Sequence, residues 1–229
     1  MPDRLKAPEL PDTVNLREEI IEACRYLSET GHMIGTWGNV SVRVEDGLLI
    51  TPSRVDYSEM VPDDLVVVDW SGKKIKGERL ASSETDLHRE LLATRLDMGS
   101  VIHTHSPYAS SVACAGVSIP VCVEDMAQVI GAEVRCSEYV PGGKHAELAE
   151  KACEAMGDES FAVLLANHGP VVGGRTLAEA VIASRVLEKA AFIYVTARTL
   201  GQFNEISLEA VCEERQRYLY KYGVEDGAR

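Results

Sequence analysis

The feature that most constrains the fold of this chain is a set of short apolar segments joined by tight turns. Residues 41–51 read SVRVEDGLLIT and residues 65–77 read LVVVDWSGKKIKG, each with a glycine-containing turn in the middle. A third run, FAVLLAN at 161–167, is followed closely by the returning run VVGGR. Tight turns join antiparallel neighbours, whereas parallel strands need long crossover connections. The sequence therefore predicts a mixed, largely antiparallel sheet.

Segments with helical periodicity alternate with these strands and predict helices on the faces of the sheet. The expected helices are 15–30, 82–96 with Ser83 as N-cap, a short one from Pro107, another at 124–130, 143–157, 176–201 and 207–221. No repeat, low-complexity run or long linker divides the chain, so we expect the α/β class and a single domain over residues 13–229. The three prolines within residues 1–12 indicate a flexible N-terminal arm.

Charge and cysteine usage limit the classes of function. Acidic residues outnumber basic residues by 36 to 23, which gives a formal net charge of −13. Such a surface repels phosphate backbones and anionic lipid, which argues against nucleic acids and membranes as partners. The six cysteines form no C-x-x-C pair, the first residues contain no apolar signal segment, and the apolar runs are too short to cross a bilayer. We expect a cytoplasmic protein that acts on a small molecule.

Two histidines, one residue apart, follow an apolar run in SVIHTHSPYAS at 100–110. Residues i and i+2 of a strand point to the same side, so His103 and His105 are expected to face the same volume. An isolated pair of this kind more often reflects packing, but His168 also follows a buried apolar run, in FAVLLANHGP. Three histidines at strand ends form the ligand set of an open zinc site. The other histidines are assigned to loops (His32, His145) and to a helix face (His88).

Two further segments carry polar groups suited to an anionic substrate. The sequence SSE at 82–84 lies at a helix start, where free backbone N–H groups and hydroxyls bind anions. Glu84 is either an acid/base group or a carboxylate favourably placed at the positive end of the helix. In GTWGNVS at 35–41, glycines relieve backbone crowding and small polar side chains offer neutral donors. This composition suits a phosphate cradle, but it is also that of an ordinary turn.

An ordered set of motifs links the chain to a known family. The segments GTWGNVSVR, LLITPS, SSETDLH, VIHTHS, AGVSIP and ANHGP, in this order between residues 15 and 201, resemble the class II aldolase/adducin-head family. The resemblance implies a three-layer αβα domain, the class II aldolase fold, assembled as a homotetramer. It also implies Zn²⁺, or another divalent metal such as Mn²⁺ or Co²⁺, in active sites at subunit boundaries.

The resemblance assigns roles to individual residues. His103, His105 and His168 match the metal ligands of the family. Glu84 matches the carboxylate that approaches the metal and serves as acid and base. The substrate-phosphate pocket is matched by Thr36, Gly38, Asn39, Ser53, Ser82 and Ser83.

Within this family the motifs favour an aldolase. Glu84 stands where the epimerase branch carries aspartate, and YKYGVED resembles the aldolase tail, with Tyr222 in place of a tyrosine that lies near a neighbouring subunit's site. We expect a divalent-metal-dependent aldolase that yields dihydroxyacetone phosphate and an aldehyde. Its expected substrate is a ketose 1-phosphate, either fuculose 1-phosphate or a 5-deoxy or 5-methylthio pentulose 1-phosphate.

Two departures from the family pattern leave alternatives open. Glu124 stands where the aldolase has a catalytic tyrosine, and a carboxylate there resembles L-ribulose-5-phosphate 4-epimerase and methylthioribulose-1-phosphate dehydratase. Either Glu124 or Tyr222 is expected to handle the aldehyde oxygen, although Glu124 also suits an ordinary helix N-terminus. Arg54 replaces a glycine next to Ser53, where its side chain either crowds the phosphate or binds it.

Overall fold

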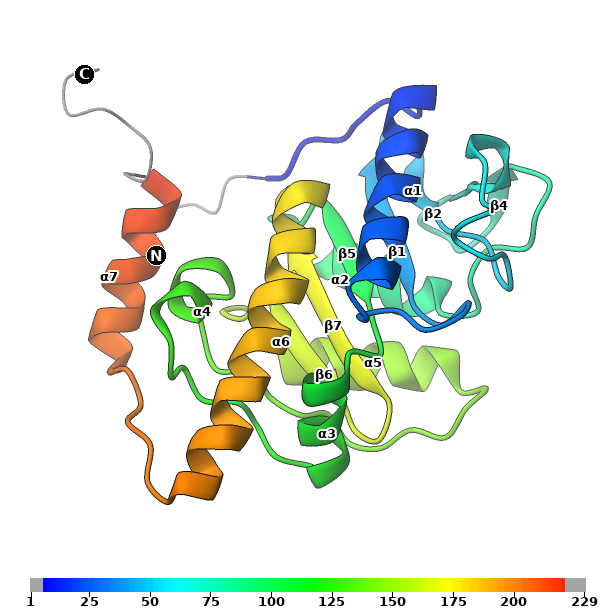
Figure 1. Ribbon diagram of the computed structural model, residues 1–229. Coiled ribbons are helices and arrows are strands. Elements are labelled where there is room, and N and C mark those ends of the chain that lie inside the picture. Colours follow the sequence, from blue (N-terminus) through cyan, green and yellow to red (C-terminus); the bar gives the residue numbers. More distant parts are fainter. Residues whose placement is uncertain (1–5, 221–229) are drawn as a thin grey trace.

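The structure is a computed structural model that describes residues 6–220 of the chain. A sheet of seven strands lies between two layers of helices (Figure 1). The strand order is β4-β3-β2-β1-β5-β7-β6, so β5 lies in the interior beside strands from both halves of the chain. The strands are β1 (Asn39–Val44), β2 (Gly47–Ile50), β3 (Val66–Val68), β4 (Lys74–Lys76), β5 (Ser100–His103), β6 (Ala162–Leu165) and β7 (Gly169–Gly174).

Every pairing between these strands is antiparallel, as the hairpins predict. The three expected hairpins are β1–β2, β3–β4 and β6–β7. Parallel contacts occur as isolated bridges, between Leu10 and Val44 and between Cys136 and Leu164. The largely antiparallel character that the sequence indicates is confirmed, and among the described residues the seven strands pair with one another only in the antiparallel sense.

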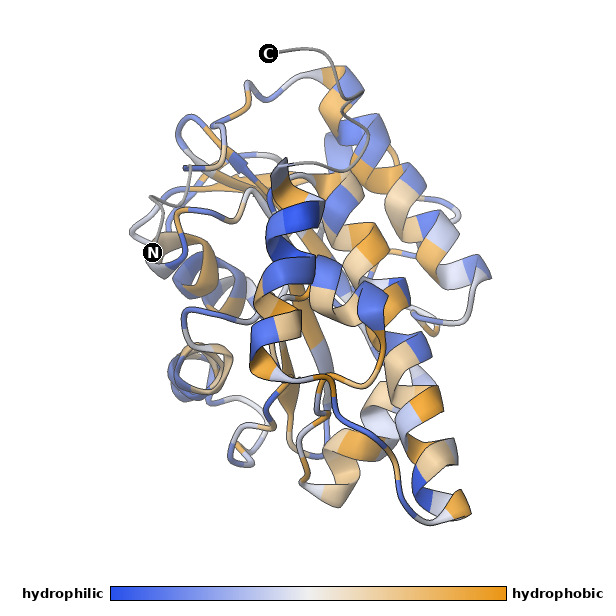
Figure 2. Cartoon of the chain, turned by 90° about the vertical axis from the view of Figure 1, so that its left-hand side faces the viewer, coloured by the Kyte–Doolittle hydropathy of each residue, from blue (hydrophilic) through white to orange (hydrophobic). Residues whose placement is uncertain are grey.

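Apart from the exposed edge strand β4, both faces of the sheet are buried, and in β2, β3, β5, β6 and β7 residues on opposite faces enter separate hydrophobic clusters. On β2, Leu49 packs into one hydrophobic cluster while Leu48 and Ile50 pack into the other. The first cluster also contains side chains of α1, α3, α4, α6 and α7, and the second contains those of α2 and α5. In Figure 2 the strands between the helices are predominantly hydrophobic. This arrangement is a three-layer αβα sandwich.

The helices lie where helical periodicity predicts them. Their bounds are α1 (Val14–Glu29), α2 (Thr85–Thr94), α3 (Pro107–Ala115), α4 (Glu124–Val129), α5 (His145–Met156), α6 (Leu177–Leu200) and α7 (Leu208–Tyr220), with a 3₁₀ turn at Pro62–Asp64. Among the residues described, no helix has the length and apolar character needed to cross a membrane.

The start of α2 differs from the prediction. Ser83 was expected as the N-cap, but the helix begins at Thr85 and Glu84 occupies the cap position. The reason is tertiary: an isolated bridge pairs Pro52 with Ala81, and the Ser82 N–H donates to the Thr51 carbonyl at 3.1 Å. Residues 81–82 are therefore held in an extended conformation beside the end of β2.

Part of the predicted N-terminal arm is in contact with the domain. The Ala7 N–H donates to the Leu96 carbonyl at 2.8 Å, and Leu10 exchanges backbone hydrogen bonds with Arg43 and Glu45. Residues 6–12 thus run along the edge of the core, while residues 1–5 lie outside the described part. The domain boundary at residue 12 stays a prediction.

A close approach of β7 to α6 provides a test of this architecture. A Cβ added at Gly174 would lie 2.3 Å from the Ala180 backbone nitrogen, whereas at Gly142 nothing lies within 4 Å. We expect Gly174→Ala to lower the free energy of unfolding by about 1–3 kcal/mol, because backbone must shift to relieve the overlap. Urea unfolding measures this loss. Gly142→Ala is the matched control, and equal stability of the two variants would contradict the packing described.

Candidate metal centre and active site

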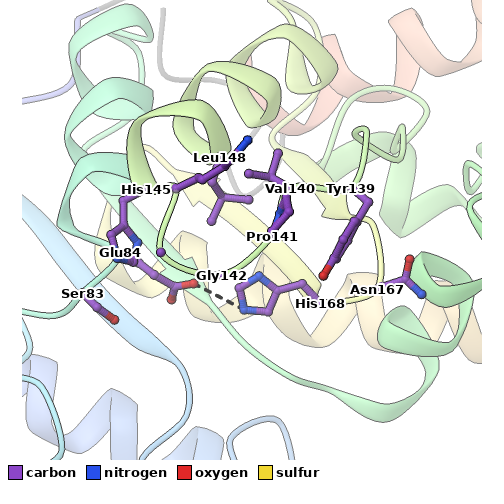
Figure 3. Close-up of a pocket in the computed structure, with 12 residues that line it drawn as sticks. Ser83, Glu84, Tyr139, Val140, Pro141, Gly142, His145, Leu148, Asn167 and His168 are labelled. Carbon is purple, nitrogen blue, oxygen red and sulfur yellow. Dashed lines mark ion pairs between the residues drawn. The ribbon is translucent and has the colours of Figure 1, made fainter.

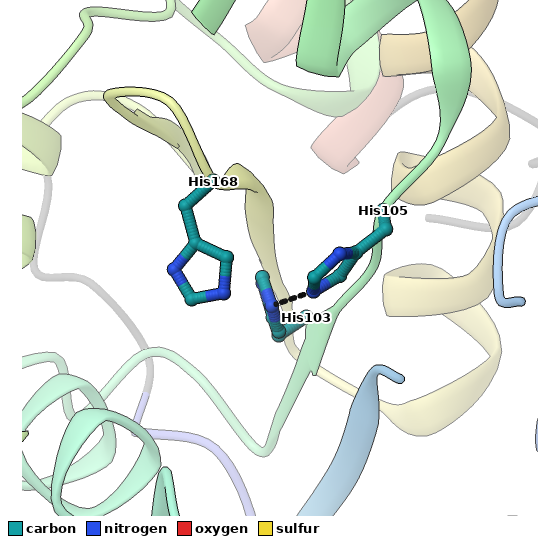
Figure 4. Close-up of side chains that lie close together, drawn as sticks. All are labelled: His103, His105 and His168. Atoms are coloured by element: carbon teal, nitrogen blue, oxygen red, sulfur yellow. Dashed lines mark hydrogen bonds between the residues drawn. The ribbon is translucent and has the colours of Figure 1, made fainter. Parts of the chain in front are cut away.

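Three histidines meet at one end of the sheet, two from the end of β5 and one from the turn of the β6–β7 hairpin. His103 is the last residue of β5, His105 follows two residues later, and His168 lies in the turn between β6 and β7. Their rings are mutually close, with centroids 4.7–5.1 Å apart (Figure 4). One nitrogen from each ring can be chosen so that all three lie within 4.8 Å of one another.

The two histidines of VIHTH do not converge through strand alternation alone, because β5 ends at His103. Beyond it, the Thr104 N–H donates to the Pro170 carbonyl at 3.1 Å. The His105 N–H then donates to the His32 carbonyl at 3.0 Å, which draws the chain toward the end of α1. His103 and His105 therefore face the same volume, as expected, but hydrogen bonds to residues distant in the sequence produce this arrangement.

The protonation of these rings suits metal binding. His103 Nδ1 lies 3.0 Å from the Pro170 carbonyl, an acceptor only, so Nδ1 carries the proton and Nε2 presents a lone pair in the neutral ring. Burial, reinforced by the neighbouring His103, lowers the pKa of both His105 and His168 to about 4. At neutral pH these two rings are uncharged. Three imidazoles with converging nitrogens are the donor set of an open zinc site, so the residues present fit a divalent cation.

Glu84 completes the cluster with a carboxylate. Its Oε1 lies 3.3 Å from His168 Nε2, and its Oε2 lies 3.6 Å from His103 Nε2. Asn39 at the start of β1 donates from Nδ2 to Glu84 Oε2 at 2.7 Å. Burial raises the pKa of Glu84, but the histidines and the Asn39 hydrogen bond outweigh it and lower the pKa to about 2. Glu84 is therefore ionised at neutral pH.

A pocket of about 250 Å³ opens beside Glu84 and His168 (Figure 3). Its walls combine Ser83, Glu84, Asn167 and His168 with residues 139–145 and Leu148. Sequence reasoning missed Tyr139 and Asn167, and it assigned His145 to a loop. His145 is instead the first residue of α5 and faces the pocket. No local pattern signals Tyr139 or His145, because only the path of the 139–145 segment brings them to the site. Asn167 reaches the pocket as the neighbour of His168 in the turn between β6 and β7, and the ANHGP motif already contained it.

The candidate phosphate-binding residues lie on segments that meet at the same edge of the sheet. Ser82 is buried and Ser53 half-buried, and both lie next to the Pro52–Ala81 bridge. Thr36 and Ser83 are exposed, and Ser83 alone of these four lines the pocket. Of the two remaining candidates, Asn39 contacts Glu84 as described above, and Gly38 has φ +107° with a Cβ there 3.0 Å from the His103 carbonyl oxygen.

The other candidates stand apart from the cluster. Glu124 is an exposed residue at the start of α4 and is not among the residues that line the pocket. Tyr222 lies outside the described residues. Arg54 is exposed with φ +61°, a left-handed conformation that favours glycine, which is the residue the family pattern has at this position.

Several known proteins are similar to this chain in sequence. The family described as "Class II Aldolase and Adducin N-terminal domain" matches residues 18–195. A 5-methylthioribulose-1-phosphate/5-deoxyribulose-1-phosphate aldolase from Rhodospirillum rubrum is 41% identical over 168 residues, covering 73% of this chain and 75% of the relative. A 5-deoxy-D-ribulose 1-phosphate aldolase from Bacillus thuringiensis serovar kurstaki is 38% identical over 188 residues, covering 81% and 87%.

A solved structure shows the same fold. An L-fuculose 1-phosphate aldolase superposes with a TM-score of 0.86 at 35% sequence identity, covering 91% of this chain and 98% of the other. The match includes both helical layers and the sheet, since nearly all of the chain is covered. The protein belongs to the class II aldolase and adducin N-terminal domain family.

Proposed function

We propose that the protein is a divalent-metal-dependent aldolase that cleaves a 5-deoxy or 5-methylthio pentulose 1-phosphate to dihydroxyacetone phosphate and an aldehyde. The observation that carries the proposal is the ionised Glu84 within 3.6 Å of two imidazoles of the histidine cluster, at the wall of a pocket. The substrate class comes from the names of the two relatives at 41% and 38% identity. Fuculose 1-phosphate is the second candidate, from the solved relative.

The histidine nitrogens would hold the cation, with Zn²⁺ expected first and Mn²⁺ or Co²⁺ as alternatives. His103, His105 and His168 supply one imidazole nitrogen each, and Glu84 is close enough to approach the same ion. When bound, the cation supplies Lewis-acid stabilisation of the negative charge that develops on the substrate oxygens as the C–C bond breaks.

Glu84 is placed to move the proton. When the bond to the aldehyde breaks, the electron pair stays with the dihydroxyacetone phosphate fragment, whose carbon then needs a proton. In the reverse direction a base must remove that same proton, and an ionised carboxylate beside the cluster can accept it. The hydrogen bond from Asn39 keeps Oε2 of Glu84 directed at the cluster side of the site.

Other parts of the proposal rest on the family resemblance. Thr36, Gly38, Asn39, Ser53, Ser82 and Ser83 are proposed to bind the phosphate through hydroxyls and N–H groups. The side-chain amide of Asn39 also donates to Glu84 in this structure. Glu124 and Tyr222, and a homotetramer with sites at subunit boundaries, stay predictions. The two relatives at 41% and 38% identity and the solved L-fuculose 1-phosphate aldolase are named as aldolases, which favours this activity over the 4-epimerase and the dehydratase.

Solvent deuterium exchange tests the reaction class directly. We expect zinc-loaded protein to exchange one carbon-bound hydrogen of dihydroxyacetone phosphate in D₂O with no aldehyde present, and a chelator to stop the exchange. Mass spectrometry measures the incorporation. If metal-loaded protein shows no exchange, the aldolase proposal is wrong, and L-ribulose 5-phosphate becomes the next substrate to try.

Removal of one histidine tests the metal centre. We expect His103→Ala to lose bound zinc and turnover together, because two imidazoles do not hold the ion tightly at neutral pH. Metal content after gel filtration measures the loss. His145→Ala is the matched control, since His145 lines the pocket outside the cluster and its removal should leave the zinc bound. Activity in metal-free His103→Ala would contradict the assignment.

Replacement of the carboxylate separates metal binding from proton transfer. We expect Glu84→Gln to keep most of the zinc yet to slow exchange into dihydroxyacetone phosphate by about 10²- to 10⁴-fold, the usual contribution of a positioned base. The amide still accepts a hydrogen bond from Asn39, so the local structure should persist. An unchanged exchange rate would remove Glu84 from the mechanism.

A further inference from the structure

A buried histidine lies directly behind the Asn39–Glu84 pair and takes no part in the chemistry proposed above. His88 lies on α2, one turn after Glu84, and is completely inaccessible to solvent. Both ring nitrogens have partners: Nδ1 lies 2.7 Å from Ser41 Oγ, and Nε2 is hydrogen-bonded to Asn39 Oδ1. A fully buried imidazole with a hydrogen-bond partner on each ring nitrogen has a fixed ring orientation.

Ser41, His88, Asn39 and Glu84 form a hydrogen-bonded series. The direction of every hydrogen bond in this series follows from the Glu84 carboxylate. This carboxylate only accepts, so the Asn39 amide must present its NH₂ group to Glu84 and its Oδ1 to His88. The carbonyl oxygen Oδ1 also only accepts, so His88 Nε2 must carry the proton. Nδ1 is then an acceptor in the neutral ring, and Ser41 Oγ donates to it.

The opposite arrangement is unfavourable at each step. A flipped Asn39 amide would place Oδ1 against the Glu84 carboxylate, two acceptors facing each other in a buried site. If His88 carried its proton on Nδ1, then Nε2 and Asn39 Oδ1 would likewise face each other without a proton between them. One set of proton positions therefore satisfies Ser41, His88, Asn39 and Glu84 together.

We infer that His88 is a positioning residue for Glu84, acting through the Asn39 amide, with Ser41 fixing the tautomer of its ring. This inference rests on the proposed function, because it assumes that the orientation of Glu84 matters for proton transfer. His88 is not a catalytic residue, since its ring has no access to the pocket.

The series is anchored on rigid elements. Asn39 and Ser41 are residues i and i+2 of β1 and point to the same side of the sheet, and both are buried. Glu84 and His88 are four residues apart at the start of α2, on the same side of that helix. The hydrogen bonds thus join the first turn of α2 to β1, whose Asn39 pairs with His103 in the sheet. Glu84 is held relative to the histidine cluster by the same contacts.

Two substitutions of His88 distinguish a hydrogen-bonding role from simple packing. Phe fills a similar volume without a donor, whereas Gln retains an N–H that can reach Asn39 Oδ1. In zinc-loaded protein we expect His88→Phe to lower the rate of deuterium exchange into dihydroxyacetone phosphate by about 10- to 100-fold, the usual cost of removing such an outer partner. Bound zinc and the KM for dihydroxyacetone phosphate should change little. His88→Gln should recover most of the exchange rate.

Leu91→Val is the control for general loosening of α2, because Leu91 is a buried core residue of the same helix. It should lower the thermal midpoint while leaving exchange per folded molecule unchanged. The inference is overturned if His88→Phe exchanges at the normal rate, or if His88→Gln is as slow as His88→Phe.

A second measurement does not depend on activity. Long-range ¹H–¹⁵N correlation spectra of the zinc-loaded protein report which ring nitrogen of His88 carries the proton. We expect a neutral ring protonated on Nε2 only. A proton on Nδ1 would overturn the inference even in a fully active protein. If no exchange occurs in the native protein but the Nε2–H tautomer is present, the proposed function fails and the hydrogen-bonded series stands.

Discussion

The arrangement of the site depends on the position of β5 between β1 and β7. In this register His103 lies opposite Asn39 on one side and Val171 on the other. Asn39 holds Glu84, and the turn that precedes β7 carries His168, so the register of one short strand brings His103, Glu84 and His168 together. A slip of one residue would turn His103 to the other face of the sheet. The hydrophobic clusters oppose such a slip, because Val101 and Ile102 of β5 pack into opposite clusters and a slip would exchange them.

Burial of the centre determines its electrostatics. Removal from water keeps the imidazoles of His105 and His168 neutral, with pKa values lowered to about 4, and so leaves their lone pairs free for a cation. Glu84 retains its charge in the same surroundings because the histidines and Asn39 stabilise the carboxylate. The net charge of −13 belongs to the whole chain and does not determine the charges of these buried groups. An anionic substrate would meet backbone N–H groups, hydroxyls and the cation at the sheet edge.

The core that packs against α2 contains fully buried polar side chains among its apolar residues. Ser41, His88 and Ser100 are fully buried, and Ser100 Oγ donates to the Ser41 carbonyl at 2.8 Å. An unpaired polar group at such a depth costs about 1–3 kcal/mol, so the network is tolerable only because its members satisfy one another. Leu87 and Leu91 of the same helix belong to the hydrophobic cluster on this side of the sheet. This side of the core therefore combines apolar packing with a hydrogen-bonded polar network.

The sequence by itself determined the features that depend on neighbouring residues. Hairpin turns specified antiparallel pairing, periodicity located the helices, and apolar runs ending in histidine marked His103, His105 and His168. Tertiary structure alone decided where α2 begins, because the Pro52–Ala81 bridge holds the residues before it. It also decided that the Asn39 amide serves Glu84 and that His145 borders the pocket. These outcomes depend on residues 22 or more positions apart in the chain coming together, and local sequence patterns carry no information about such contacts.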